Sequence, residues 1–123
     1  MSAILIVEDD DATAQLIASV LRHIGHQLLI APNATRGLAL AQENELVMVI
    51  LDMRLPGMTG WELASILRSD LNLTQIPIIA VSVQVERDDP QRAIQAGCDE
   101  YIAKPFNIND LRDCVNYYLG DTS

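Results

Sequence analysis

Five short runs of aliphatic residues are spread along the chain, and longer stretches with a different spacing of apolar residues separate them. The runs cover residues 3–7, 27–31, 46–51, 78–82 and 100–103. Several are apolar almost throughout and lack an alternation of apolar and polar residues, which is typical of strands buried on both faces of a parallel sheet. We therefore predict five β-strands at these positions, several of them buried on both faces.

The stretches between these runs, and the one after the last, predict five amphipathic helices. In each, apolar residues recur at the three- and four-residue steps that place them on one helix face. The five stripes are Ala12, Leu16, Ile17, Val20, Leu21 and Ile24; Ala34, Gly37, Leu38 and Ala41; Leu63, Ile66 and Leu67; Ala93, Ile94 and Ala96; and Ile108, Leu111, Val115, Tyr118 and Leu119. The fourth stripe is the poorest, which fits either a small alanine-rich helix or an element that moves, because weakly packed segments open at low cost.

Polar residues and glycines mark the expected ends of these helices. Side-chain oxygens of Asp, Thr and Asn satisfy free backbone N–H groups at a helix start, and glycine is common just after a helix end. The signals are Asp10 or Asp11 for the first start, Thr59 for the third, Asn107 or Asn109 for the fifth, and Gly25 and Gly97 for the ends of the first and fourth.

The alternation of five strands with five helices predicts a single α/β domain over residues 1–123. The units repeat about every 20–25 residues, without a linker or a low-complexity segment. Right-handed crossovers then place helices on both faces of a five-stranded, doubly wound parallel sheet. A chain of 123 residues suits one domain and is too short for two.

The charge balance argues against some classes of function. Eight Lys and Arg residues against 17 Asp and Glu residues give a net charge of −9, which argues against electrostatic capture of nucleic acid or of an anionic membrane. The longest apolar runs have about six residues, whereas a membrane helix needs ~20. The N-terminus also lacks the residue order of a signal peptide. We expect a cytoplasmic protein.

The cysteines and histidines add little chemistry. Cys98 and Cys114 form neither a metal-ligand spacing nor a C-x-x-C pair, so we interpret them as reduced thiols. His23 and His26 flank Gly25 at the expected end of the first helix. A cation is favourable at a helix C-terminus, and we interpret both histidines as capping or surface residues.

The ends of the strands carry the most informative polar residues. In a doubly wound sheet, binding and catalytic groups collect at the carboxyl ends of the strands. The residues at these ends are Glu8, Asp9 and Asp10 for the first strand, Asp52 for the third, Ser82 for the fourth, and Lys104 with Pro105 for the fifth. Lys104 is the only lysine of the chain, and a flexible ammonium can reach a phosphate or a carboxylate as a point charge.

These residues together predict a site for phosphoryl chemistry. Glu8, Asp9 and Asp52 would repel one another unless a positive charge lay between them. Hard oxygen ligands of this kind suit Mg²⁺, and Lys104 offers a second cation. Asp52 could then act as a nucleophile toward a phosphoryl group, with Ser82 donating a hydrogen bond. The metal and the lysine would spread the charge of the transferring group.

Each of these residues also has an ordinary structural explanation. An acid after the first strand can be only an N-cap, Asp52 can be a loop acid, strand-end serines such as Ser82 are common, and Lys104–Pro105 can be a turn. Three consecutive acids exceed what one cap requires, and we assign Asp10 to the cap or to a spectator position. The joint placement of the acids, the serine and the lysine favours the functional interpretation.

Four segments resemble the response-regulator receiver domain of two-component signalling. They are ILIVEDD at residues 4–10, VILDMRLPGMTGWEL at 49–63, IPIIAVS at 76–82 and AGCDEYIAKPF at 96–106. The resemblance covers essentially the whole chain and is to a single-domain receiver like the chemotaxis regulators. It implies a flavodoxin-like sheet with strand order 2-1-3-4-5 and a signalling switch rather than an enzyme.

The resemblance also implies roles for single residues. Asp52 matches the phospho-accepting aspartate, and Glu8 and Asp9 match the acidic pair that holds Mg²⁺. Arg54 matches the position whose backbone carbonyl binds the metal. Lys104 matches the lysine that bonds the phosphoryl group, in a Lys–Pro bond that is cis in the family.

The implied switch pair is Ser82, which moves to bond the phosphoryl oxygen, and Tyr101, which turns inward when Ser82 moves. Arg54 and Gln84 lie at the variable positions that tune the lifetime of the phosphoryl group. The implied readout face comprises the fourth helix, fifth strand and fifth helix. The implied partners are a histidine kinase or phosphotransfer protein and a downstream protein, with the chain a monomer or weak dimer that does not bind nucleic acid.

Two alternatives compete with the receiver. A haloacid-dehalogenase-type phosphatase also uses an aspartyl nucleophile after a strand, but it wants a second Asp two residues later, where Arg54 stands. It also needs a cap region that 123 residues barely allow. A pseudo-receiver, a non-phosphorylated interaction module of the same fold, usually lacks the acceptor, an acid or the lysine, and here none is lost.

Overall fold

Five strands alternate with five helices along the chain, in the positions that the hydrophobic pattern predicts. The computed structural model describes residues 2–120. The elements are β1 (Ser2–Val7), α1 (Asp11–Leu21), β2 (Gln27–Ala31), α2 (Ala34–Glu43), β3 (Glu45–Leu51), α3 (Gly60–Ser69), β4 (Ile78–Val83), α4 (Asp89–Ala96), β5 (Glu100–Lys104) and α5 (Ile108–Leu119).

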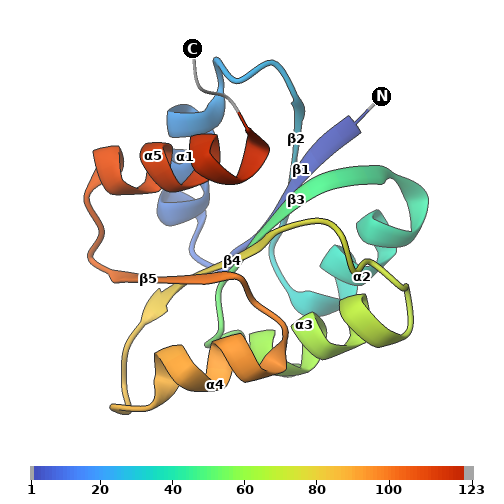
Figure 1. Cartoon of the computed structure of the whole chain (residues 1–123), viewed down its shortest axis with the longest axis vertical. Coiled ribbons are helices and arrows are strands. Elements are labelled where there is room, and N and C mark those ends of the chain that lie inside the picture. Colours follow the sequence, from blue (N-terminus) through green and yellow to red (C-terminus); the bar gives the residue numbers. More distant parts are fainter. Residues whose placement is uncertain (1, 121–123) are drawn as a thin grey trace.

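The strands form one parallel sheet in the order β2-β1-β3-β4-β5. Helices α1 and α5 cover one face of this sheet, and α2, α3 and α4 cover the other (Figure 1). The predicted doubly wound, flavodoxin-like architecture is confirmed. The chain order reverses between β1 and β3, and the crevice at such a reversal is the usual ligand site of an open α/β sheet.

The core lies in two layers because both faces of the sheet are covered. Ile4 and Ile6 of β1 pack toward α1 and α5, whereas Ala3, Leu5 and Val7 pack toward α2 and α3. Successive side chains of a strand point to opposite faces, so a strand buried on both sides must be apolar at every position. This explains why the central runs show no alternation of apolar and polar residues.

The helix caps resolve the choices that the sequence left open. Asp10 caps α1 by accepting a hydrogen bond from the Thr13 N–H at 2.9 Å. Asn107 caps α5, and Thr59 caps α3 as predicted. Gly97 ends α4 with a φ of 117°, in the left-handed region where glycine carries no steric penalty.

The end of α1 differs from the prediction. The helix stops at Leu21 with Arg22 as its C-cap, four residues before Gly25. Gly25 has a φ of 93° and forms part of the turn into β2. The two histidines are therefore not capping residues: His23 is exposed, and Nδ1 of His26 lies 3.0 Å from Oγ of Ser2. Ile24 lies in the turn after α1 and not in the helix. It fits the apolar pattern of α1 because its side chain also packs against the core.

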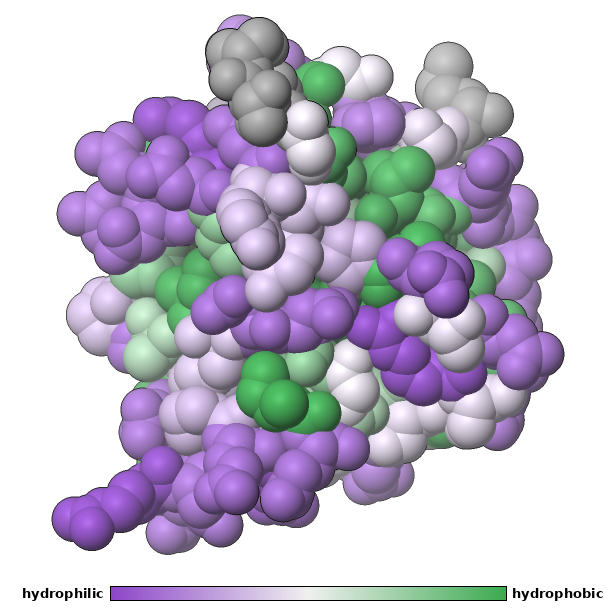
Figure 2. All heavy atoms as spheres, viewed as in Figure 1, coloured by the Kyte–Doolittle hydropathy of each residue, from purple (hydrophilic) through white to green (hydrophobic). Residues whose placement is uncertain are grey.

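Three large hydrophobic residues of the predicted stripes are exposed. Leu16 is 41% exposed, Ile94 is 49% exposed and Ile108 is 41% exposed. Figure 2 shows the same mixture, with separate hydrophobic patches surrounded by hydrophilic surface. Helix α4 has only eight residues and buries only Asp89 and Ala93, so its poor stripe corresponds to weak packing. No helix within residues 2–120 has the length and apolar character needed to cross a membrane.

Arg68 of α3 connects the loops that precede β4 and β5. Its guanidinium donates hydrogen bonds to the backbone carbonyls of Leu73 and Ile76 at 2.6 Å each, and to that of Gly97 at 2.9 Å. It also pairs with Asp99 at 2.9 Å. The planar fork of arginine presents donors in fixed directions, which is what such a divergent set of acceptors requires.

Replacing Arg68 by methionine is expected to lower the free energy of unfolding by about 2 kcal/mol, because charged donors are removed from partly buried carbonyls. Urea unfolding followed by circular dichroism measures this loss. Arg68→Lys should recover only part of it, since one ammonium cannot reach all four acceptors. Arg36→Met, at an exposed position of α2, serves as the control. A loss no larger than that of the control would contradict the assignment.

Candidate functional site

The reversal of strand order brings the predicted acids together. Glu8 and Asp9 follow β1, and Asp52 follows β3, the neighbour of β1 in the sheet. The backbone continues the sheet for one more residue on each strand: the Glu8 N–H bonds the Ala31 carbonyl at 3.0 Å, and the Asp52 N–H bonds the Val7 carbonyl at 2.9 Å. The acids are therefore held by the end of the sheet and not by a free loop.

Lys104 lies between two of these acids. Its Nζ is 2.6 Å from Oε1 of Glu8 and 3.1 Å from Oδ2 of Asp52. It is the last residue of β5 and precedes a cis peptide bond to Pro105, as the resemblance implied. The ammonium is thus a bridge between carboxylates that come from two different strands.

Asp52 is the most completely hydrogen-bonded of the acids. Its side chain is 6% exposed. Its Oδ1 accepts hydrogen bonds from the Arg54 N–H at 2.9 Å and from Oγ of Ser82 at 2.8 Å, while Oδ2 faces Lys104. Burial alone would raise the pKa of Asp52, but these hydrogen bonds outweigh burial and hold it below its usual range. Asp52 is therefore an ionised, buried carboxylate at neutral pH.

The pKa values of Glu8 and Lys104 show how burial and the contacts between opposite charges act against each other in the site. Burial raises the pKa of Glu8 to about 7, although hydrogen bonds from Lys104 and from the Asp10 N–H act in the opposite direction. Burial alone would lower the pKa of Lys104, but its bonds to Glu8 and Asp52 raise it. One ammonium therefore faces two buried carboxylates, and a further positive charge would stabilise both in the ionised form.

The acids also meet the requirements of a small divalent cation. Glu8, Asp9 and Asp52 each offer a carboxylate oxygen, and these three atoms lie within 4.8 Å of one another. Asp9 is exposed, whereas the other two are buried. The donor set is therefore open to water on one side and consists of hard oxygen ligands, which suits Mg²⁺ with its retained waters.

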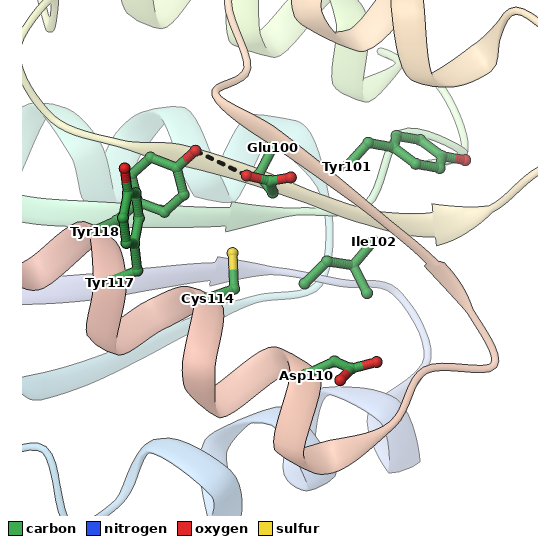
Figure 3. A pocket seen from close by; sticks show the side chains of 7 residues that line it. All are labelled: Glu100, Tyr101, Ile102, Asp110, Cys114, Tyr117 and Tyr118. Atoms are coloured by element: carbon green, nitrogen blue, oxygen red, sulfur yellow. Dashed lines mark hydrogen bonds between the residues drawn. The ribbon is translucent and has the colours of Figure 1, made fainter.

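Tyr101 lies on the side of Ser82 away from Asp52. Its hydroxyl group donates a hydrogen bond to the Ser82 carbonyl at 3.4 Å. Tyr101 also lines a cavity of about 400 Å³ between β5 and α5, and Figure 3 shows its ring directed away from Cys114 and Tyr118. The predicted switch pair is thus in contact, and Ser82 already bonds Asp52 in this structure.

Two further predicted residues have side chains that turn away from Asp52. The Gln84 amide donates to the backbone carbonyls of Glu86 and Arg87 in its own loop. The Arg54 guanidinium pairs with Asp89 at 2.6 Å. Asp10 is exposed and serves as the cap of α1. The carboxylates, Ser82 and Lys104 therefore form the site itself, and Arg54 and Gln84 border it.

Asp89 and Trp61 are the residues beside the site that the sequence analysis did not single out. Asp89 is 1% exposed at the start of α4, and Trp61 is 7% exposed at the start of α3. The sequence Asp88-Asp89-Pro90 signals a helix start, but nothing in it indicates a buried ion pair with Arg54, 35 residues earlier. Only the packing of α3 against α4 brings these residues together.

The fold and the site define a class of protein: a doubly wound α/β domain with a buried aspartate, a paired lysine and a cluster of three carboxylates that could hold a cation, at the reversal of strand order. Comparison with known sequences and structures identifies the family. The family described as "Response regulator receiver domain" matches residues 4–116. The chain belongs to this family of two-component signalling domains.

Individual relatives agree with this assignment over the full length of the chain. The polar-differentiation response regulator DivK from Brucella anthropi is 31% identical over 119 residues, which are 97% of each chain. The structure of a CheY-like receiver domain protein from Methanospirillum hungatei is 29% identical, with a TM-score of 0.88, over 98% of this chain and 95% of that one. The receiver domain of the Francisella response regulator 1452 is 27% identical, with a TM-score of 0.86, over 98% of each.

Proposed function

We propose that this receiver domain is a phosphorylation switch in which Asp52 accepts a phosphoryl group in the presence of Mg²⁺. The observation that carries the proposal is the environment of Asp52: a buried, ionised carboxylate that faces the Lys104 ammonium, accepts a hydrogen bond from Ser82, and belongs to a cluster of three carboxylates that could hold a cation. A loop acid with only a structural role has no need of this set of partners.

The transfer is a displacement at phosphorus. An oxygen of the Asp52 carboxylate forms a bond to the phosphorus of the donor, and the bond from phosphorus to the donor atom breaks. The bonding electron pair stays with that atom, which is the imidazole nitrogen of a phosphohistidine or a carboxylate oxygen of acetate when the donor is acetyl phosphate. Lys104 and Ser82 are placed to donate hydrogen bonds to the oxygens of the transferred group.

Glu8, Asp9 and Asp52 would hold the cation, together with the backbone carbonyl of Arg54. When bound, Mg²⁺ supplies positive charge that offsets the charge of the phosphoryl oxygens. Glu8 has a second function in this proposal, because its contact with Lys104 orients the ammonium toward Asp52. The chain's own groups thus orient the acceptor and balance its charge.

Phosphorylation would be read through the face formed by α4, β5 and α5. We propose that the Ser82 hydroxyl, which bonds Asp52 here, moves to bond an oxygen of the new phosphoryl group. Tyr101, whose hydroxyl contacts the Ser82 carbonyl, then turns inward into the space that Ser82 leaves. Such a change shifts the population between two existing states. The partners would be a histidine kinase or phosphotransfer protein as donor and a downstream protein as receiver of the signal.

Intact-mass measurement after incubation with acetyl phosphate tests the proposal. We expect the mass of one phosphoryl group to be gained with Mg²⁺, and none to be gained with EDTA or in the Asp52→Asn variant. Asp110→Asn is the matched control, since Asp110 is an exposed acid in the first turn of α5. If no phosphoryl group is gained although Mg²⁺ binds, the chain is better described as a non-phosphorylated interaction module.

A further inference from the structure

We propose that Asp89 is a positioning residue: it holds the Arg54 side chain against α4, and Arg54 thereby couples the charge at Asp52 to the loop that precedes α4. This inference rests on the proposed phosphorylation of Asp52. This connection is separate from the Ser82–Tyr101 contact, because it runs from the loop after β3 to the start of α4 and involves neither residue.

Arg54 touches both ends of this connection. Its backbone N–H donates to Oδ1 of Asp52 at 2.9 Å, and its guanidinium Nη2 lies 2.6 Å from Oδ2 of Asp89. A single residue thus contacts the acceptor with its backbone and the start of α4 with its side chain. A change in charge at Asp52 acts directly on a residue that also restrains α4.

Asp89 fastens the loop as well as the helix. The same Oδ2 atom that pairs with Arg54 accepts hydrogen bonds from the N–H groups of Val85 and Glu86, at 2.9 and 3.1 Å. Asp89 is also one of only two buried residues of α4. The Asp89 carboxylate therefore joins the loop of residues 84–88 to the first turn of α4, and it depends on Arg54 for its counter-charge.

The Arg54–Asp89 ion pair leaves some of its hydrogen-bonding groups unused, so another anion can compete with Asp89 for Arg54. Within residues 2–120, Nε of Arg54, Oδ1 of Asp89 and Nε1 of Trp61 are buried without a hydrogen-bond partner. Buried polar atoms without partners are costly, so the cluster does not use all the bonds that a guanidinium and a carboxylate can form. An anion that offers more acceptor oxygens to Arg54 can displace Asp89.

A phosphoryl group on Asp52 would be such an anion. It carries a charge of about −1.5 to −2 in place of the single negative charge of the free Asp52 carboxylate, and it presents three strong acceptor oxygens. Arginine binds such groups with two parallel hydrogen bonds. If the guanidinium moves toward it, the buried Asp89 carboxylate loses its counter-charge and must reach water. The loop and the weakly packed first turn of α4 then open together, as one two-state element.

Trp61 supplies a direct readout of this cluster. It is the only tryptophan of the chain. The guanidinium carbon of Arg54 lies 4.6 Å from the centre of its ring, and that of Arg92 lies 3.9 Å from it. Movement of Arg54 changes the charge over the indole, so the fluorescence of Trp61 reports on this cluster without an added probe.

The decisive variant is Asp89→Asn, which keeps an acceptor oxygen for the loop N–H groups but removes the charge that holds Arg54. Asp88→Asn is the matched control: it makes the same chemical change one residue away, at an exposed position with no side-chain capping bond. Each protein is treated with acetyl phosphate and Mg²⁺. Intact mass, Trp61 emission and hydrogen exchange at the Val85 and Glu86 amides are measured on the same samples.

In the parent chain and in Asp88→Asn, phosphorylation should shift the Trp61 emission and accelerate exchange at the two amides by about tenfold. In Asp89→Asn, exchange should already be this fast before phosphorylation, with little further change. Arg54→Gln should behave like Asp89→Asn, and Arg54→Lys, which keeps the charge, should retain part of the response. The two Arg54 variants also carry the test if Asp89→Asn fails to fold.

The intact mass distinguishes a failure of the proposed coupling from a failure of the proposed phosphorylation. If the parent chain gains the phosphoryl group but Trp61 emission and exchange do not change, or if Asp89→Asn keeps the full response, the coupling is overturned and the proposed function stands. If no phosphoryl group is gained at all, the proposed function is overturned and the coupling with it. A response of Asp88→Asn equal to that of Asp89→Asn would also overturn the role of Asp89.

Discussion

Replacing Lys104 by glutamine is expected to slow phosphoryl transfer to Asp52 by about 100-fold, which is the usual effect of removing one donor from developing negative charge. The ammonium is the one cationic side chain that contacts Asp52 within residues 2–120, at 3.1 Å. Glutamine keeps a hydrogen-bond donor but not the charge. The time course of intact mass with acetyl phosphate and saturating Mg²⁺ measures the rate.

The Lys104→Gln variant should also bind Mg²⁺ about tenfold more tightly than the parent chain. In the parent chain, Lys104 already supplies part of the positive charge that a divalent cation would supply. Its Nζ lies 2.6 Å from Glu8 as well as 3.1 Å from Asp52. Calorimetric titration measures the affinity. Slower phosphoryl transfer together with tighter Mg²⁺ binding is the important result. A variant that only disturbs the candidate site would weaken both transfer and cation binding.

Arg112→Gln is the control for Lys104→Gln. Arg112 is an exposed cation of α5 whose side chain bonds Asn109, and its removal changes the net charge equally. We expect the rate and the affinity of this variant to match those of the parent chain. A similar gain in Mg²⁺ affinity in both variants would mean that net charge, and not the position of Lys104, governs cation binding.

Replacing Gly60 by alanine is expected to lower the free energy of unfolding by about 3 kcal/mol, the upper end of the usual cost of overpacking. A Cβ atom there would collide with the backbone carbonyl of Asp52 and would lie 2.6 Å from Cα of Met53. Neither neighbour can yield easily, because both belong to the backbone that follows β3. Urea unfolding measures the loss, and phosphoryl transfer to Asp52 should slow as the acceptor is displaced.

The Gly57→Ala variant tests whether the loss of stability in Gly60→Ala comes from this clash or from placing alanine at a glycine position in general. Gly57 has a φ of 76° and open space around its Cα, so alanine there only adds backbone strain of about 1 kcal/mol. It should leave phosphoryl transfer unchanged. Equal losses of stability in the two variants would show that the close approach of Gly60 to Asp52 has no special importance.

Much of the site could be predicted because a parallel sheet aligns its strands. Glu8, Asp52, Ser82 and Lys104 come from four separate segments, yet each stands near the carboxyl end of a predicted strand. All such ends meet at one edge of the sheet. The hydrophobic runs therefore located the site residues as well as the strands, and the common edge brings these residues within reach of one another.

The directions of long side chains could not be predicted in this way. The position of Arg54 next to Asp52 followed from sequence, but its guanidinium reaches Asp89 and Trp61 across the contact between α3 and α4. Arg68 likewise reaches carbonyls of loops far from it in sequence. These contacts depend on how two helices pack, and the pattern of apolar residues on each helix does not specify its neighbour.

The sequence by itself determined the order of elements, the two-faced burial of the sheet and the residues of the candidate site, because strand burial and strand ends are local features of the chain. Only the tertiary structure decided that Gly25 lies in a turn beyond the end of α1, that Lys104 bridges Glu8 and Asp52, and that Asp89 is the partner of Arg54. Those outcomes depend on distances between segments that are remote in sequence, and such distances are set by packing.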